Sequence, residues 1–357
     1  MTDLLILLGV VLGIIAISKV VSVLNMVSTA KGENSYMPNA RENRLQARLM
    51  PVFLIAYFAF IIWQIVSWGD RMLPVAASEH GQTIDDLMNI TWLIITPVFV
   101  ITHILLFYFA WKYAYDKNRK ATYFSHSNKL EILWTAIPAT VLLILVLYGL
   151  SVWNKITTPL TAEDDKIEIE LYARQFDWTA RYPGEDEKFG KVNVRFIEGV
   201  NFLGMDSSDV NGADDKYVKA EFHLPVNKNV QFYFRAQDVI HSAYMPHFRA
   251  QMNCVPGMIT RFQFKPNKTT AEMKEITGNP EFTYMLMCNK ICGAAHYNMK
   301  MEIIVESEED YNQWLSEQKE FLAVEETIKV EEKIAPPSDS TETNVEESDQ
   351  LSVLTND

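Results

Sequence analysis

Residues 288–299 read CNKICGAAHYNM and place two thiols, one imidazole and one thioether within 12 residues: Cys288, Cys292, His296 and Met299. A second imidazole, His241, lies upstream in the run 238–242, DVIHS. The combination of Cys, His and Met selects copper over magnesium, calcium or manganese. A single blue-copper centre needs one Cys, but a tight loop can aim both sulfurs here at one point. Because two thiolates can bridge two metals, the pattern predicts a binuclear electron-transfer site with no open position for substrate.

Simpler explanations exist for each part of this pattern. The two cysteines could form a disulfide or remain two buried thiols, and Met299 alone could fill the core. A zinc site could use Cys, Cys and His, but structural zinc usually takes further Cys or His ligands and does not use Met. The joint pattern therefore favours copper. Cys254 and His247 lie outside it, and we expect both to be structural.

From about residue 163 apolar and polar residues alternate with a period of two, which is typical of half-buried strands. The predicted strands are 166–178, 217–224, 229–236, 258–264, 282–288 and 299–305. Several short strands separated by turn signals predict a β-sandwich. His241 follows one predicted strand and the loop from Cys288 to Met299 joins two others, so the ligands fall where a rigid scaffold presents its loops. The polar stretch 183–216 is predicted to be a long surface insertion.

The end of the chain holds all of the net charge of -13. Residues 306–357 contain 16 acidic and 3 basic residues, and the remainder contains 29 of each. A basic footprint for nucleic acid is therefore absent. We expect an amphipathic helix over 307–334, with Ser307 and Asp310 as its capping pattern. The composition of 335–357 predicts a disordered acidic tail.

Four segments of the first 154 residues are long and apolar enough to cross a bilayer, near 4–26, 50–68, 91–111 and 132–153. Basic residues gather between the first and second segments and between the third and fourth: Lys31, Arg41, Arg44, Arg48, Lys112, Lys117, Arg119, Lys120 and Lys129. Excess Lys and Arg mark the cytoplasmic side. We therefore expect both termini, and everything after residue 154, to lie outside.

The first segment could instead be a cleaved signal peptide. Its start carries Asp3 and no Lys or Arg, whereas a signal peptide begins with a basic region. We expect an uncleaved helix.

On these residues the chain resembles cytochrome c oxidase subunit II over about 91–320. Besides the membrane hairpin and the loop 288–299, the similar runs are 128–138 (NKLEILWTAIP), 175–178 (QFDW), 238–242 (DVIHS) and 252–257 (MNCVPG). The resemblance implies a transmembrane hairpin over 91–154 and a cupredoxin-like domain with a dinuclear CuA centre over 163–306. In that family His241 and His296 would each bind one copper. Cys288 and Cys292 would bridge the pair, with Met299 and the backbone carbonyl of Lys290 as weak ligands.

The family accepts electrons from cytochrome c or an equivalent haem donor and passes them to haem in catalytic subunit I, which reduces O2 and pumps protons. The resemblance thus implies a non-catalytic, electron-accepting subunit in a bacterial inner membrane. Glu131 matches a family glutamate near a proton-uptake entrance, and the alternative is a charged cap on a helix. No Cys-x-x-Cys-His occurs, so the donor is a separate protein or subunit.

Three departures from the family pattern stand out. The family usually has Glu between the two cysteines, where it helps to hold magnesium at the subunit boundary. Lys290 occupies that place here, which puts the magnesium contact in doubt while leaving the backbone carbonyl as a ligand. The family's electron-accepting tryptophan aligns with Phe176, while Trp178 keeps the second aromatic residue. Two extra helices within 1–68 precede the hairpin, and we hypothesise that they dock a neighbouring subunit or respiratory complex.

Three other functions compete with this interpretation. A quinol-oxidase subunit II would share the hairpin and sandwich but lack the copper ligands. A nitrous-oxide-reductase-type enzyme would carry the copper motif after a large propeller domain. A copper-delivery or structural membrane protein would need fewer ligands than this closed set.

Overall fold

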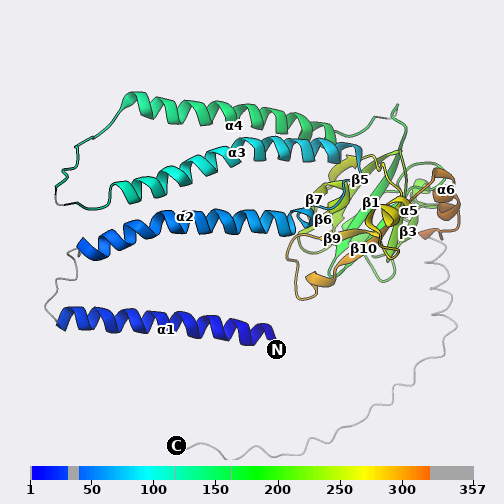
Figure 1. The fold of residues 1–357 in the computed structure, drawn as a ribbon. Helices are drawn as coiled ribbons and strands as arrows, with labels where there is room; N and C mark the ends of the chain where they lie inside the picture. The colour runs from blue at the N-terminus through cyan, green and yellow to red at the C-terminus, as the bar shows by residue number, and fades with distance from the viewer. Residues whose placement is uncertain (1, 31–39, 117, 162, 322–357) are drawn as a thin grey trace, which may run out of the picture. The chain divides into compact units, whose positions relative to one another are not determined.

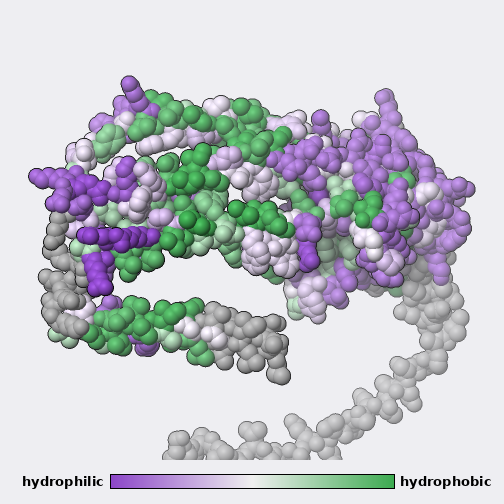
Figure 2. All heavy atoms as spheres, in the orientation of Figure 1, coloured by the Kyte–Doolittle hydropathy of each residue, from purple (hydrophilic) through white to green (hydrophobic). Residues whose placement is uncertain are grey.

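The computed structural model describes residues 2–30, 40–116, 118–161 and 163–321. Its first part contains four long helices, which are α1 (Thr2–Ala30), α2 (Ala40–Trp68), α3 (Glu79–Lys112) and α4 (Asn128–Thr157) (Figure 1). Each contains a stretch long and apolar enough to span a membrane, with a mean hydropathy of 2.0 to 2.3. The four predicted segments lie within these helices. Figure 2 shows hydrophobic residues along the helices, whereas hydrophilic residues predominate on the sandwich.

Helix α3 begins at Glu79, well before the predicted start at 91. Ser78 explains the early start, because its hydroxyl accepts a hydrogen bond from the backbone N–H of Gly81 at 3.1 Å. The same hydroxyl donates to the carbonyl of Phe248 at 2.8 Å. Asp85 also forms an ion pair with Arg249 at 2.8 Å. Residues 75–85 therefore belong to the same compact unit as the sandwich.

His103 lies in the middle of α3 and packs as an ordinary aromatic residue. Its Nδ1 lies 2.8 Å from the carbonyl oxygen of Phe99. Its ring stacks on Tyr57 with centroids 5.6 Å apart. These contacts agree with a structural role for His103.

The second part is a sandwich of two five-stranded sheets. The first sheet has the order β3-β2-β1-β5-β8, with bounds β3 (Lys216–Val218), β2 (Asp177–Tyr182), β1 (Lys166–Arg174), β5 (Asn229–Ala236) and β8 (Thr260–Phe264). The second has the order β4-β10-β9-β6-β7, with bounds β4 (Glu221–Pro225), β10 (Lys300–Glu306), β9 (Tyr284–Cys288), β6 (His241–Met245) and β7 (Ala250–Cys254). β1 pairs with β5 in parallel, as β10 does with β4, and the other pairs are antiparallel. This is the predicted β-sandwich, and its core is the apolar layer between the sheets.

Two of the predicted strands are each split by a turn. The prediction of one strand over 166–178 is wrong, because the chain turns at Gln175 and Phe176 between β1 and β2. The prediction of one strand over 217–224 is also wrong. Ala220 adopts a φ of 70° there, so the chain leaves one sheet and enters the other. β6, β7 and helix α5 (Thr270–Thr277) were not predicted, because their sequences lack a clear period.

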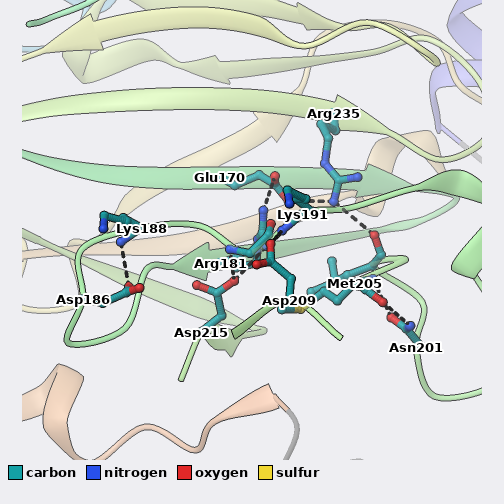
Figure 3. Close-up of polar contacts among 12 residues, drawn as sticks. Glu170, Arg181, Asp186, Lys188, Lys191, Asn201, Met205, Asp209, Asp215 and Arg235 are labelled. Carbon is teal, nitrogen blue, oxygen red and sulfur yellow. Dashed lines mark hydrogen bonds and ion pairs between the residues drawn. The ribbon is translucent and has the colours of Figure 1, made fainter. Parts of the chain in front are cut away.

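The stretch 183–216 is more than a surface insertion. It contains two short 3-10 helices, η2 (Val194–Phe196) and η3 (Val210–Gly212). Its Leu203 and Met205 are buried in a small second core with Tyr172 and Phe321. The insertion also closes over a buried ionic cluster, in which Arg181 pairs with Glu170 at 2.8 Å and with Asp215 at 2.9 Å (Figure 3).

The C-terminal helix is shorter than the predicted 307–334. Helix α6 spans Glu308–Ser316, and the Ser307 side chain accepts the backbone N–H of Asp310 as its N-cap. Trp314 anchors the helix by stacking on His223 with a centroid distance of 3.9 Å. After Ser316 the chain leaves the helix, and the backbone of Glu320 forms an isolated antiparallel β-bridge with Lys216. Residues 322–334 and the tail 335–357 lie outside the described residues.

Candidate metal centre

The predicted ligands come from one end of the second sheet. His241 follows β5, as predicted, and is the first residue of β6, a strand that was not predicted. Cys288 is the last residue of β9, and Met299 directly precedes β10. β6 and β9 pair antiparallel, with Ala243 opposite Cys288. This register places the start of β6 beside the end of β9, so His241 and Cys288 share one edge.

The side-chain donors converge on one another. Cys288 Sγ lies 3.9 Å from His241 Nδ1 and 3.9 Å from Cys292 Sγ. Cys292 Sγ lies 3.6 Å from His296 Nδ1 and 3.9 Å from Met299 Sδ. The structure thus brings all five predicted side-chain donors together.

A backbone oxygen completes the set. The carbonyl of Lys290 lies 3.2 Å from Cys288 Sγ, while the lysine side chain is exposed to solvent. The loop therefore presents a backbone oxygen to the sulfurs whatever side chain stands at this position.

The sulfurs are free thiols in a largely buried setting. Their separation of 3.9 Å is far beyond the roughly 2.05 Å of a disulfide. Burial, and next the neighbouring Cys288, raise the pKa of the Cys292 thiol to about 11. Since two adjacent thiolates repel each other, a bound cation is what would stabilise them together. The soft, convergent donor set fits copper, and a Met sulfur in that set argues against zinc.

Two aromatic residues border the centre. Trp178 is fully buried, its Nε1 donates to the carbonyl of Met299 at 3.4 Å, and its ring meets that of His241 edge-on at 6.3 Å. Phe176 is 37% exposed and lies against the loop. A Cβ on Gly293 would come within 2.8 Å of its ring. Both aromatic residues therefore touch the donor loop or its ligands.

Two supporting residues were not assigned a role from the sequence. Gln175 donates its side-chain N–H to the carbonyl of Cys292. Asp238 accepts from Nε2 of His241 at 2.8 Å. The spacing of Asp238 three residues before a ligand histidine was the available signal. Gln175 gave none, because its contact joins segments 117 residues apart.

Glu131, the predicted proton-uptake residue, lies in the first turn of α4 and not in the sandwich. Its carboxylate accepts the backbone N–H of Ser127 at 3.2 Å, and its side chain is exposed. This contact fits the role of a charged cap at a helix N-terminus.

Comparisons with known proteins agree with this architecture. The profile of "Cytochrome C oxidase subunit II, transmembrane domain" matches residues 62–152, and that of "Cytochrome C oxidase subunit II, periplasmic domain" matches 167–308. The chain is 36% identical over 243 residues to "Alternative cytochrome c oxidase subunit 2" of Bradyrhizobium diazoefficiens, covering 68% of this chain and 82% of that protein. It is 26% identical over 258 residues to "Cytochrome c oxidase subunit 2" of Cereibacter sphaeroides, covering 68% of this chain and 77% of that protein.

Among solved structures, one similar chain is the periplasmic domain of subunit II of cytochrome oxidase from Bradyrhizobium japonicum. The identity is 22%, the TM-score is 0.29, and the match covers 44% of this chain and 95% of that chain.

Proposed function

The chain belongs to the cytochrome c oxidase subunit II family, and on that premise we propose that it is the subunit through which a membrane oxidase accepts electrons, at a dinuclear copper centre. It is a subunit II of a haem–copper oxidase and a membrane protein with a domain outside the membrane. Its family and its cupredoxin-like sandwich point to copper as the metal. The electron-accepting role and the number of coppers are the proposal.

One observation carries the proposal, which is the convergence of five side-chain donors at successive separations of 3.6 to 3.9 Å. His241 and His296 would each hold one copper, and the two cysteine sulfurs would bridge the pair. Met299 and the Lys290 carbonyl would be the weaker ligands. When bound, two coppers that share thiolates supply a one-electron carrier with no open position for substrate. This closed set is the reason to favour electron transfer over copper delivery.

The protein's own residues would guide electrons to and from this centre. Phe176 is the half-exposed aromatic side chain that packs against the donor loop at Gly293. We propose that it receives electrons in place of the family's tryptophan. Trp178 is buried against Met299 and His241, so its proposed role is to hold the loop and shorten the path.

The partners follow from the same role. The donor would be cytochrome c or a haem-bearing respiratory complex, and the acceptor would be haem in catalytic subunit I, which reduces O2 and pumps protons. Both termini would lie outside a bacterial inner membrane, as the basic connections indicate. Glu131 would stand near proton uptake in the assembled oxidase, although its contact with Ser127 also suits a helix cap.

The two extra helices call for their own explanation. The family match begins at residue 62, so nearly all of 1–68 precedes it. We propose that this segment docks a neighbouring subunit or a partner respiratory complex. Deleting 1–68 should release that neighbour from the purified assembly, and an unchanged assembly would remove the idea.

Copper stoichiometry combined with electron paramagnetic resonance tests the central proposal. The full chain, purified in detergent and loaded with copper, should bind two coppers. It should also show one unpaired electron shared between both nuclei. A one-copper signal would count against it.

Matched variants separate the ligands from their surroundings. Cys292→Ser should abolish the shared-electron signal, because it removes one bridging sulfur. Cys254→Ser, which changes a buried thiol outside the donor set, should keep the signal.

A further inference from the structure

A polar cavity of about 290 Å³ lies where the start of α3 and the end of α4 meet β8, the edge strand of the first sheet. All of its lining residues belong to the compact unit that contains the sandwich. A second cavity of about 410 Å³ adjoins it, because Lys155 and Gln263 line both. None of the donors of the metal centre lines either cavity. The polar residues of the first cavity include Glu79, Thr83, Lys155, Asn229, Gln263 and Lys265.

Hydrogen bonds hold the walls of the first cavity in place. The backbone N–H of Glu79, the first residue of α3, donates to the carbonyl of Lys265 at 3.0 Å. The side-chain amide of Gln263 donates to the carbonyls of Lys155 and Thr158, at 2.7 and 2.8 Å. The ends of both helices are thus fastened to β8 or to the residue that follows it. The cavity is therefore formed before any ligand enters, as is usual for binding sites.

Three donors line the cavity and are not shut off from it. Lys155 is exposed, and its ammonium has no hydrogen-bond or ion-pair partner among the described residues. The hydroxyl of the half-buried Thr83 likewise has no partner within those ranges. Lys265 approaches Glu79 only to 3.8 Å, and 37% of its side chain is exposed. A ligand in the cavity can reach these three groups, whereas the ring nitrogens of His80 in the same wall are buried.

The charges that line the cavity favour a ligand with a single negative charge. Lys155 and Lys265 bring two positive charges and Glu79 brings one negative charge, so one positive charge is unmatched. The carboxylate of Asp164, in the second cavity, already accepts from the N–H and the hydroxyl of Thr161 at 2.6 and 2.8 Å. Ammonium groups and hydroxyls are donors that phosphate oxygens accept from, and such charge-assisted hydrogen bonds are the strong ones. A phosphate diester therefore fits the cavity.

The place of the cavity in the chain indicates where such a phosphate comes from. Lys155 lies in the last turn of α4, two residues beyond the apolar segment 132–153, and both α3 and α4 contain candidate membrane spans. The end of a membrane span lies at the depth of the lipid headgroups. Leu150 and Trp153, directly before Lys155 on α4, are 51% and 47% exposed. An apolar surface for acyl chains thus continues from the lysine.

We propose that this cavity binds the headgroup of an anionic phospholipid of the phosphatidylglycerol type, on the side of the membrane that carries the sandwich. The phosphate would accept from Lys155, Lys265 and Thr83, and the glycerol hydroxyls would donate to Glu79. The acyl chains would lie along the apolar surface of α4. The proposal requires only that the chain spans a membrane, so it does not depend on the copper assignment.

Native mass spectrometry of the delipidated full chain in detergent tests the proposal, with dioleoylphosphatidylglycerol as the probe and dioleoylphosphatidylcholine as its zwitterionic counterpart. The chain should retain one phosphatidylglycerol with an affinity at least about tenfold above that for phosphatidylcholine, whose choline charge meets no free carboxylate. Raising the salt concentration should weaken this preference, because the contacts are only partly buried. Soluble glycerol 3-phosphate at equal concentration should not displace the lipid, since it lacks the acyl chains.

Matched variants locate the binding. Lys155→Gln should lower the affinity for phosphatidylglycerol about tenfold, and Thr83→Val should lower it about threefold. Lys274→Gln is the control, because it removes an exposed positive charge of α5 in the same unit but outside both cavities. Thermal unfolding of each variant reports whether the fold survives.

The purified oxidase complex should retain the same lipid. Its absence there would mean that another subunit covers the cavity, and would overturn the proposal. Equal affinities of wild type for the two lipids, an unchanged affinity in Lys155→Gln, or displacement by glycerol 3-phosphate would overturn it as well.

Discussion

The carboxylate of Asp238 lies 2.8 Å from Nε2 of His241 and fixes which nitrogen of that ring carries the proton. An ionised carboxylate only accepts hydrogen bonds, so Nε2 must donate. The lone pair is then on Nδ1, the atom that lies 3.9 Å from Cys288 Sγ. Asp238 is itself held by the backbone N–H groups of Gln175 and Val239, each at 2.7 Å. The histidine is thus oriented for a metal before any metal binds.

The first prediction follows from this contact. Asp238→Asn should lower copper affinity about 10- to 100-fold, because the amide no longer enforces the same tautomer. Competition with a copper chelator measures the change. Asp177→Asn is the matched control, since Asp177 is the first residue of β2 and faces Arg174 and Lys219 instead of a ligand. Equal affinities for the two variants would show that Asp238 does not position the ring.

The second prediction concerns Gly293. Its φ is 145°, and a Cβ there would meet the Phe176 ring at 2.8 Å and the Gln175 amide nitrogen at 2.9 Å. Gly293→Ala should therefore destabilise the protein by about 1–3 kcal/mol, through crowding and backbone strain together. Thermal unfolding monitors the loss. Gly257→Ala isolates the strain, because Gly257 has a φ of 78° and a Cβ added to it would meet no atom of the described residues within 4 Å. A smaller loss at Gly293 than at Gly257 would contradict the crowding.

The third prediction is a pH dependence at Asp215. Burial raises the pKa of this carboxyl to about 6 against the opposing effect of Arg181, and its Oδ1 has no partner within the part of the chain described. The folded state then holds a proton that the unfolded state releases near pH 3.8, so stability falls as the pH rises from about 4 to 6. Asp215→Asn removes this loss of stability. The unfolding free energy of the variant should therefore rise relative to that of wild type by up to about 3 kcal/mol as the pH goes from 4 to 7.

Denaturant unfolding across that pH range measures the Asp215 effect. Asp206→Asn is the control, because hydrogen bonds from Ser208 lower the pKa of Asp206 and keep it ionised above pH 4. The difference in unfolding free energy between Asp206→Asn and wild type should not change with pH. If the difference for Asp215→Asn also did not change with pH, Asp215 would not hold a proton in the folded state.

The fourth prediction separates the third cysteine from the other two. Cys254 pairs across the sheet with His241 and is fully buried, and burial raises the pKa of its thiol to about 12. It should stay protonated and resist alkylation in the folded protein. Cys254→Ala should keep the copper content of wild type and cost about 1 kcal/mol of unfolding free energy. Loss of copper would instead make Cys254 part of the centre.

Phe176 gives a fifth prediction, which bears on electron transfer. Phe176→Ala should slow reduction of the copper centre by a haem donor, because the half-exposed ring beside Gly293 is lost. Phe176→Trp should preserve the rate. Stopped-flow absorbance follows the reduction, and Phe196→Ala, an exposed aromatic residue of η2, is the control. A normal rate in Phe176→Ala would exclude this residue from the path.

The local sequence determined the donor residues of the metal centre and the positions of the membrane-spanning helices. Helices within 50–68, 91–111 and 132–153 follow from unbroken apolar runs, because a helix satisfies its own backbone inside a membrane. The donors between Cys288 and Met299 follow from residue type and spacing alone. The strand 229–236 is equally local, since its alternation is regular from end to end.

Only the tertiary structure decided what depends on contacts between distant segments. The breaks at Gln175–Phe176 and Lys219–Ala220 separate strands that the alternation alone would join, because a period of two does not reveal where a chain turns or changes sheets. The side chain of Gln175 contacts the donor loop, and Gly293 leaves room for Phe176, only where the turn between β1 and β2 packs against that loop. The guanidinium of Arg235 likewise lies over the ring of Tyr172, although the two residues lie on separate strands far apart in the sequence. Packing brings such residues together, and no local pattern records that proximity.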